Sequence, residues 1–249
     1  MGKKKEIKTG FLNDISEEQL KVLEQVKTWL HDEVKVNNSL YDDWYLLRFC
    51  RARKFKLPDI KIMITNMLKF RDEKGIDYMV QKDFQAKFAH KYTLSNSCYF
   101  CIDKIGRPVR IDQLSTWQVE KIRKDIPMED TVAMFSLEEE MLIHCILPMC
   151  SNIAGKRIEQ DVIIQDMKGF GVGKLMDKPV REWFKALAKV AQDNYPELLG
   201  QTIIINAPFY VNAAWAVISQ FLDKKTRKKI QILGSNYQKK LYELVDRDV

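Results

Sequence analysis

Two short runs of β-branched residues most limit how this chain can fold. Val162-Ile163-Ile164 and Ile203-Ile204-Ile205 carry no charge, which is typical of strands buried on both faces of a sheet. Between them, apolar residues recur at helical spacing after Pro179, namely Val180, Trp183, Phe184, Leu187 and Val190. A strand, a helix and a strand in this order favour an α/β layer structure with a partly parallel sheet.

The first third of the chain is predicted to be helical. Ser16 and Gln19 have the spacing of a capping box, so a helix should begin there. Further helices are expected from about Asp43 through Ala52 and from Pro58 to a stop at Gly75. We therefore expect a flexible basic N-terminus at residues 1–15 and a small helical domain at residues 16–90.

The pattern changes after Lys91. Residues 97–102 and 109–114 are predicted strands that flank a turn at residues 103–106, and a long helix is expected over about 128–147. Residues 91–249 should therefore form a second, α/β domain.

Composition restricts the class of partner. The 249 residues are 46% hydrophobic, enough for a sizeable core, and the net charge of +7 favours anionic partners such as membrane surfaces, lipid head groups or nucleic acid. The uncharged segment Ala207 to Leu222 is shorter than the ~20 residues of a membrane-spanning helix. Five cysteines without an export signal indicate reduced, cytoplasmic thiols.

Two pairs of residues have the spacing of metal ligands. Cys98 and Cys101 form a C-x-x-C motif, but side chains three apart on a strand point to opposite faces, so a plain strand is favoured. Glu140 and His144 lie four apart on a predicted helix without an evident third ligand, so a solvated helix face is favoured. We expect no metal and no other cofactor.

A glycine-rich loop is the strongest enzyme-like signal. Gly169 to Lys174 follows a predicted strand, but Lys174 stands where a dinucleotide loop has its third glycine. Lys168 and Leu175 stand where a phosphate loop of the NTPase kind has glycine and a hydroxyl residue. A nucleotide-binding enzyme remains an alternative.

Two further segments each allow two interpretations. The basic residues of Arg48 to Lys54 could face nucleic-acid phosphates, but the solvated face of a packed helix is favoured. The apolar segment Phe209 to Leu222 could be a buried core helix. Because the basic cluster Lys224 to Lys229 follows it, the segment could instead insert into the interface of an anionic membrane.

Six motifs occur together in one order along the chain. They are Leu46 to Phe55, Gly106-Arg107-Pro108-Val109, Asp166-Met167-Lys168-Gly169, Asn194-Tyr195-Pro196-Glu197, Ile205 to Phe209 and Leu233 to Gln238. In these motifs the chain resembles the CRAL-TRIO lipid-binding family, and within it the fungal phosphatidylinositol/phosphatidylcholine transfer branch. The resemblance runs from about Ser16 onward. It implies a small N-terminal helical domain packed on a larger α/β lipid-binding domain, whose mostly parallel sheet floors an apolar cavity.

The resemblance also implies functional residues. The inositol-phosphate site would comprise Arg53, Lys54, Glu197, Thr226 and Lys229, with Glu197 orienting the lysine. The gate through which lipid enters would be the helix near residues 212–222, and its apolar residues would be Phe209, Trp215, Val217, Ile218, Phe221 and Leu222.

A second lipid site departs from the family pattern. Tyr99 matches the first of two tyrosines, but Arg110 replaces the second, and Gly171 and Gly173 stand where hydroxyl residues are expected. An arginine removes a ring face that could bind a cation and adds a like charge, so phosphatidylcholine should bind weakly if at all.

The function implied is that of a non-enzymatic lipid-transfer protein. It would hold one phospholipid, preferably phosphatidylinositol, and dock transiently on anionic membranes. We expect a cytoplasmic monomer, peripherally associated with membranes and without a nucleic-acid partner. The lipid-binding domain ends at Val249, sooner than the family pattern. A module that senses lipid without transferring it is a further alternative.

Overall fold

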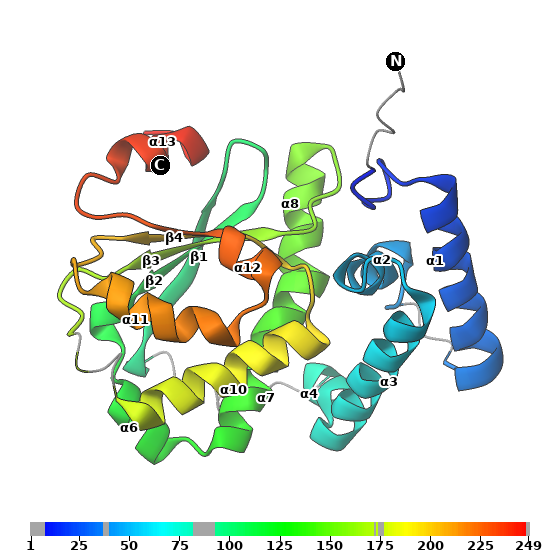
Figure 1. Cartoon of the computed structure of the whole chain (residues 1–249), viewed down its shortest axis with the longest axis horizontal. Coiled ribbons are helices and arrows are strands. Elements are labelled where there is room, and N and C mark those ends of the chain that lie inside the picture. The colour runs from blue at the N-terminus through cyan, green and yellow to red at the C-terminus, as the bar shows by residue number, and fades with distance from the viewer. Residues whose placement is uncertain (1–7, 37–39, 82–92, 172, 174–176, 248–249) are drawn as a thin grey trace. The chain divides into compact units, whose positions relative to one another are not determined.

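The chain divides into two compact units. The computed structural model describes residues 8–36, 40–81, 93–171, 173 and 177–247 (Figure 1). One unit comprises Met1–Phe70 and the other Arg71–Val249.

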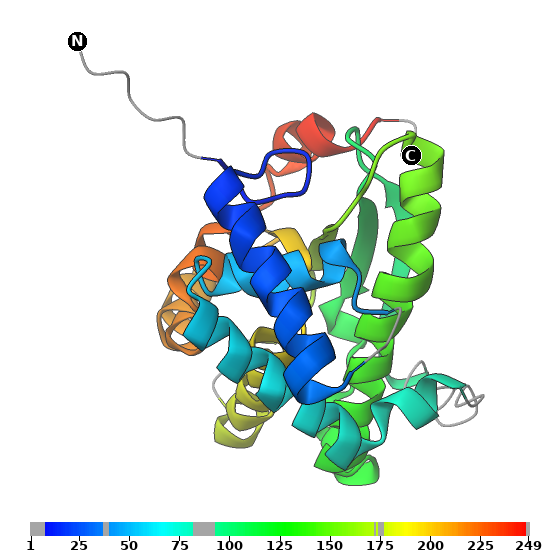
Figure 2. The same ribbon diagram turned by 90° about the vertical axis from the view of Figure 1, so that its right-hand side faces the viewer.

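The first unit is helical, as predicted. It contains α1 (Glu17–Trp29), the π-helical turn η1 (Leu30–Val34), α2 (Asp43–Ala52) and most of α3 (Leu57–Lys74), and α1 packs on α2 (Figure 2). The predicted capping box is present, because Gln19 N donates to Ser16 Oγ at 3.1 Å and Ser16 N donates to Gln19 Oε1 at 2.9 Å. These bonds satisfy amides that the first helical turn would otherwise leave unpaired.

The favoured interpretation of the basic stretch in α2 is wrong for two of its arginines. Arg48 and Arg51 are 4% and 6% exposed and are not on a solvated face. The Arg48 guanidinium stacks on the Tyr45 ring at 4.3 Å, and that of Arg51 stacks on Phe11 at 4.0 Å. Planar guanidinium groups can be buried against aromatic faces in this way, an arrangement that helical periodicity does not reveal.

The second unit is built on a five-stranded sheet in the order β1-β2-β3-β4-β5. The strands are β1 (Asn96–Ile102), β2 (Pro108–Gln113), β3 (Asp161–Asp166), β4 (Leu199–Ile205) and β5 (Ile230–Ile232). β1 and β2 form an antiparallel hairpin, and the remaining neighbours are parallel. The predicted mostly parallel sheet is confirmed, whereas β5 was not predicted because its three residues are too few to show a pattern.

Helices cover both faces of this sheet. On one side lie α6 (Val119–Asp125), α7 (Met128–Met141) and α10 (Lys178–Asn194), and on the other lies α13 (Gln238–Leu244) (Figure 1). The gate segment comprises α11 (Val211–Ile218) and the 3-10 turn η4 (Ser219–Phe221), and the short α12 (Lys224–Lys228) follows it. A further short α4 (Ile76–Gln81) precedes the sheet, and the 3-10 turn η2 (Leu114–Thr116) follows β2.

The two faces of the sheet differ in polarity. Val109, Val162, Ile164, Ile203 and Ile205 form a core under α13. The residues between them face α7 and α10 and include charged groups, because side chains alternate along a strand. A bulge between Tyr99 and Cys101 breaks this alternation in β1, so the face argument applied to the C-x-x-C motif does not hold across it.

The hairpin turn requires a glycine. Gly106 has φ +94°, and a Cβ there would lie 2.7 Å from the Cβ of Ala154 at the end of α8 (Leu147–Ala154). Both the backbone angle and the close approach exclude a larger residue.

The long helix predicted over about 128–147 extends further than expected. After α7, a π-helical turn η3 (Leu142–Ile146) leads directly into α8, which ends at Gly155 in the left-handed region. Pro148 does not end the helix, and it lies in the first turn of α8, directly after the π-helical turn.

Glu140 lies in the core of the second unit and not on a solvated helix face, so that interpretation is also wrong. It is 2% exposed and pairs with Arg71 through two contacts, the longer of which joins Nη2 to Oε2 at 3.3 Å. His144 Nε2 lies 3.1 Å from Glu140 Oε2, and Arg71 also donates to Asp77 at 3.0 Å. Burial opposes the charge of Glu140, but the bonds to His144 and Arg71 outweigh it and lower its pKa to about 2.

None of the helices described is long and apolar enough to cross a membrane.

Replacing Glu140 should destabilise the protein. Glu140→Gln leaves the buried Arg71 partly uncompensated, so the free energy of unfolding should fall by about 3 kcal/mol. Urea denaturation measures this change. Glu129→Gln is the matched control, because its pair with Lys74 is on the surface and should change stability by less than about 0.5 kcal/mol.

This effect should depend on pH. The pKa of Glu140 falls from 4.5 to about 2 on folding, so its contribution is complete above pH 4.5 and is lost as the pH falls toward 2. The difference in unfolding free energy between wild type and Glu140→Gln should therefore shrink between pH 5 and pH 3. A constant difference over this range would contradict the assignment.

Candidate functional site

A cavity of about 560 Å³ lies between the sheet and the helices on its polar side. Its helical wall is largely apolar and includes Ile122, Ile126, Met134, Phe135, Trp183, Phe184 and Leu187. Its floor is polar and includes Ser97, Tyr99, Arg110, Asp112 and Gln165 from β1, β2 and β3. A volume and lining of this kind suit a ligand with an apolar body and a polar group.

The floor contains a compensated buried arginine. Arg110 Nη2 donates to Asp112 Oδ2 at 3.4 Å, and Nε lies 3.2 Å from Oδ1 in an ion pair without hydrogen-bond geometry. Tyr99, which pairs with Arg110 in the β1–β2 register, donates its hydroxyl to Asp161 Oδ2 at 3.2 Å. Two carboxylates from neighbouring strands therefore lie near one guanidinium.

Burial controls the protonation of these groups. It raises the pKa of Asp161 to about 6, since the charge of Arg110 and the Tyr99 hydrogen bond only partly offset it. Burial alone would lower the pKa of Arg110, but the charges of Asp112 and Asp161 outweigh it and raise the pKa. Arg110 thus stays charged, while Asp161 titrates close to neutral pH.

The structure brings together two of the four residues predicted for the second lipid. Tyr99 and Arg110 share the cavity floor, whereas Gly171 and Gly173 follow β3 and are not among the residues that line the cavity. The charge of Arg110 is already matched by Asp112, so like-charge repulsion alone cannot exclude choline. The remaining reason to expect weak choline binding is that Arg110 has no aromatic ring to contact the quaternary ammonium.

The glycine loop is described only in part, and Gly173 at its end has helical backbone. Lys174 and Val172 lie outside the described residues, and α10 begins at Lys178. Gly169 has φ +78° and ends a turn in which Lys168 N donates to Asp166 Oδ1 at 2.9 Å.

A second polar cluster surrounds Glu197, at the turn between α10 and β4. The Glu197 side chain is 7% exposed, and Lys225 Nζ donates to its Oε1 at 2.6 Å. Lys229 Nζ lies 3.9 Å from Glu197 Oε2 and donates to the Leu199 carbonyl at 2.5 Å. We call Glu197, Lys225, Thr226 and Lys229 the clamp.

Asp223 caps α12 and thereby fixes the clamp residues on it. Its Oδ1 accepts from Lys225 N at 2.7 Å and Thr226 N at 2.9 Å, and its Oδ2 accepts from Thr226 Oγ1 at 2.5 Å. Partial burial opposes the charge of Asp223, but these bonds lower its pKa. Thr226, Lys229 and Glu197 are thus brought together in one unit.

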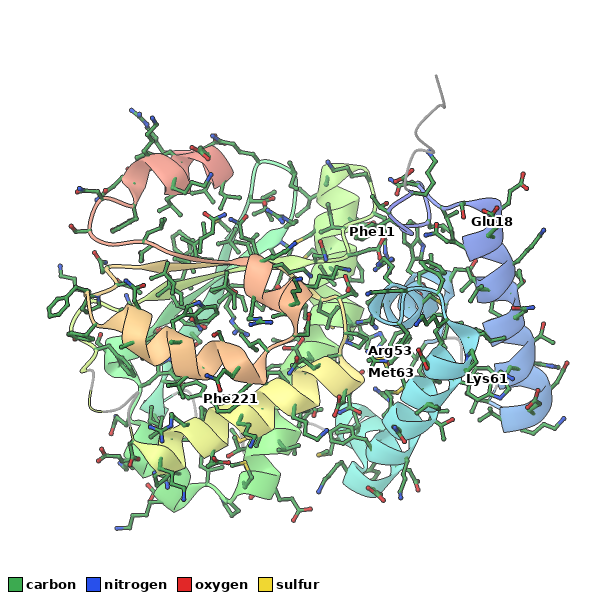
Figure 3. The ribbon with its side chains drawn as sticks, viewed as in Figure 1. Phe11, Glu18, Arg53, Lys61, Met63 and Phe221 are labelled. Atoms are coloured by element: carbon green, nitrogen blue, oxygen red, sulfur yellow. The ribbon has the colours of Figure 1, made fainter. Side chains whose placement is uncertain are left out.

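Arg53 and Lys54 lie in the other unit, at the end of α2 (Figure 3). Arg53 is half-buried and Lys54 is exposed. Lys54 and Phe55 both have positive φ, 51° and 58°, so the chain turns sharply after the helix. Their role in head-group binding stays a prediction.

The gate segment packs at the carboxyl ends of the parallel strands. Val211 and Ala214 are buried against Leu114, Met167 and Phe170, and Ile218 packs on the same cluster. None of residues 207–222 lines the cavity. Trp117 packs on this cluster and also lines the cavity, so this side chain is shared by the two.

The apolar residues predicted for the gate differ in exposure. Phe209 is 90% exposed, whereas Trp215, Val217, Ile218, Phe221 and Leu222 are half-buried. The segment is therefore neither a fully buried core helix nor a freely exposed one.

Sequence reasoning missed three polar residues of these clusters. Asp112 and Asp161 compensate Arg110, and Lys225 contacts Glu197. The alternation Val109-Arg110-Ile111-Asp112 could have indicated that Arg110 and Asp112 share a face, whereas the contact of Asp161 depends on strand order. Within the described part of the chain, no group of three or more acidic, histidine or cysteine side chains could hold a metal ion.

Comparison with known proteins gives consistent matches along the chain. The CRAL/TRIO domain matches residues 95–249, and the CRAL/TRIO N-terminal domain matches residues 6–66. The chain is 36% identical over 207 residues to the phosphatidylinositol/phosphatidylcholine transfer protein SFH12 of Arabidopsis thaliana, which covers 83% of this chain and 38% of that protein. It therefore spans well under half the length of this relative.

A shorter relative is matched over most of its length. The chain is 35% identical over 213 residues to the Sec14 cytosolic factor of Schizosaccharomyces pombe, covering 83% of this chain and 72% of that protein. The crystal structure of Sfh5 has the same fold, with a TM-score of 0.68 at 17% identity, over 91% of this chain and 84% of that one. From these matches, the chain belongs to the CRAL/TRIO family.

Proposed function

We propose that this protein binds a single phospholipid, best phosphatidylinositol, and carries it between membranes. The cavity of about 560 Å³ with its apolar helical wall is the observation on which the proposal rests. The names of the relatives in Arabidopsis thaliana and Schizosaccharomyces pombe support it, since the former is a phosphatidylinositol/phosphatidylcholine transfer protein and the latter a cytosolic factor.

The cavity would replace the bilayer around the acyl chains. Two chains contain on the order of 30 methylenes, and burying each contributes about 0.8 kcal/mol, so escape from a membrane into water is very slow. Contact with Trp183, Phe184 and Leu187 would offset this loss. Transfer then requires no covalent step and no catalytic residue.

The clamp would bind the inositol phosphate. A phosphodiester accepts charge-assisted hydrogen bonds from an ammonium group and a hydroxyl, which Lys229 and Thr226 can donate. Both groups now donate to protein oxygens, Lys229 to Leu199 and Thr226 to Asp223, and the phosphate would take the place of these acceptors. Glu197 would keep Lys229 in position.

The gate segment would open at a membrane surface. It carries the exposed Phe209 at its start and the exposed cations Lys224, Lys225, Arg227 and Lys228 beyond its end. Apolar and basic groups together suit the interface of an anionic membrane, to which the protein would associate peripherally from the cytoplasm. Displacing α11 would uncover Trp117 and with it the cavity.

Two experiments distinguish lipid transfer from lipid sensing and from nucleotide binding. A vesicle-to-vesicle assay detects transfer, which a sensing module would not perform. Binding of ATP or NAD in a calorimeter, with no lipid in the purified protein, would overturn the proposal in favour of the glycine-loop alternative.

Lys229→Ala should reduce phosphatidylinositol loading. Losing one charge-assisted hydrogen bond to the phosphate should lower the loaded fraction about tenfold at limiting lipid, with the fold intact. Native mass spectrometry after incubation with phosphatidylinositol vesicles measures the loaded fraction. Lys228→Ala removes a neighbouring exposed lysine of α12 and serves as the control for membrane charge. Equal loading of the two variants would refute the role given to Lys229.

Phosphatidylcholine should load poorly compared with phosphatidylinositol. The Tyr99 hydroxyl is bound to Asp161, and Arg110 offers no ring face to the quaternary ammonium. From vesicles with equal amounts of both lipids, extracted lipid should contain about tenfold more phosphatidylinositol. Comparable loading of the two lipids would contradict this assignment of the cavity floor.

A further inference from the structure

The Gln192 side chain connects three elements of the second unit. Its Nε2 donates to the carbonyl of Ala188 on α10 and to that of Phe221 in η4, both at 3.0 Å. Its Oε1 accepts from Asp223 N at 2.9 Å. Both amide protons and the carbonyl oxygen are thus bonded, which fixes the orientation of the side chain.

The two contacts of Gln192 outside α10, to Phe221 and Asp223, lie on either side of the joint between the gate segment and α12. Phe221 ends the gate segment, Leu222 is extended, and Asp223 begins α12 as its cap. Phe221 is also held at α10 by Lys185, whose Nζ lies 5.4 Å from the ring centroid (Figure 3). Neither Phe221 nor Asp223 can move from α10 without breaking a bond to Gln192.

One side of the joint leads to the clamp. Asp223 binds the backbone of Lys225 and the hydroxyl of Thr226, and Lys225 binds Glu197. Lys229 follows α12 directly and is part of the same cluster. A displacement of Asp223 therefore alters the clamp.

The other side leads to the cavity. Ala188 and Ala191 of α10 line it, and Gln192 is the next residue. Gate segment, cavity wall and clamp therefore meet at this one amide.

We propose that Gln192 is a positioning residue that couples the gate segment to the clamp, so that opening at Phe221 and loosening of α12 occur together. The inference rests on the proposed function, in which the gate admits lipid and the clamp holds its head group. The inference adds a link between lipid entry at the gate segment and head-group binding at the clamp. Through this link, binding of the head group would favour closure of the gate segment.

Hydrogen exchange in the lipid-free protein tests the link directly. Gln192→Met keeps the length of the side chain and removes its hydrogen bonds, so amides in 211–218 and 219–229 should both exchange about tenfold faster. Gln220→Ala is the matched control, because among the described residues Gln220 donates at 3.1 Å to Ala216, within the gate segment itself. Unchanged exchange in Gln192→Met, or equal acceleration in the control, would overturn the proposal.

A second variant tests the coupling itself. Thr226→Val breaks the hydroxyl bond to Asp223, and in the wild-type background it should accelerate exchange in both α12 and 211–221. In the Gln192→Met background the same change should affect α12 alone. If the gate segment responds equally in both backgrounds, the coupling does not pass through Gln192.

Lipid measurements separate this inference from the proposed function. With vesicles containing phosphatidylinositol, Gln192→Met should release lipid to acceptor vesicles severalfold faster, while its loaded fraction at equilibrium stays within about twofold of wild type. A release rate equal to that of wild type would overturn the coupling. Unchanged loading in Lys229→Ala would instead refute the head-group assignment, with the exchange pattern of Gln192→Met intact.

Discussion

The alternation of side chains along β2 determines the character of the whole second unit. Val109 packs into the core under α13, while Arg110 and Asp112 face the cavity. A charge buried at this position is tolerable only if neighbouring groups compensate it, and carboxylates on β2 and β3 do so. The cavity therefore has an apolar wall formed by helices and a polar floor formed by strands. A ligand in this cavity must therefore present apolar groups to the wall and polar groups to the floor.

This floor has a consequence for where an anionic head group can bind. Arg110 is the only cation on the described part of the cavity lining, and Asp112 and Asp161 already neutralise it. A phosphate placed beside Arg110 would face these carboxylates as well, so its net attraction would be small. The clamp has two lysines around one carboxylate, and one of them, Lys225, is exposed to solvent. The two clusters are therefore suited to different parts of a ligand, the clamp to an anion and the floor to a less charged group.

Much of the fold could be predicted from sequence, because helical and strand periods are local. The capping box at Ser16 and the strand runs at Ile163 and Ile204 are examples. The errors concern charged residues whose partners are distant in sequence. Glu140 is buried because Arg71 compensates it, and Arg51 is buried because Phe11 covers its guanidinium. Periodicity assigns charged residues to the surface, so it cannot identify such pairs. Of the clamp residues, Glu197, Thr226 and Lys229 followed only from family motifs and Lys225 was missed, since Glu197 and Lys229 meet through the order of β4 and β5.

The C-terminal end of α10 joins these features physically. Its last turns contribute Ala188 and Ala191 to the cavity wall and carry Gln192, and the chain then turns at Glu197. Glu197 has φ 64°, a left-handed conformation that costs a non-glycine residue on the order of 1 kcal/mol. It persists because Gln160 Nε2 donates to its carbonyl at 3.1 Å and lysines hold its carboxylate. The strained turn after α10 directs the Glu197 carboxylate to Lys225 of α12. A ligand that took the lysines away from Glu197 would therefore remove contacts that stabilise its left-handed backbone. The resulting change in the turn would reach the gate segment through the C-terminal end of α10.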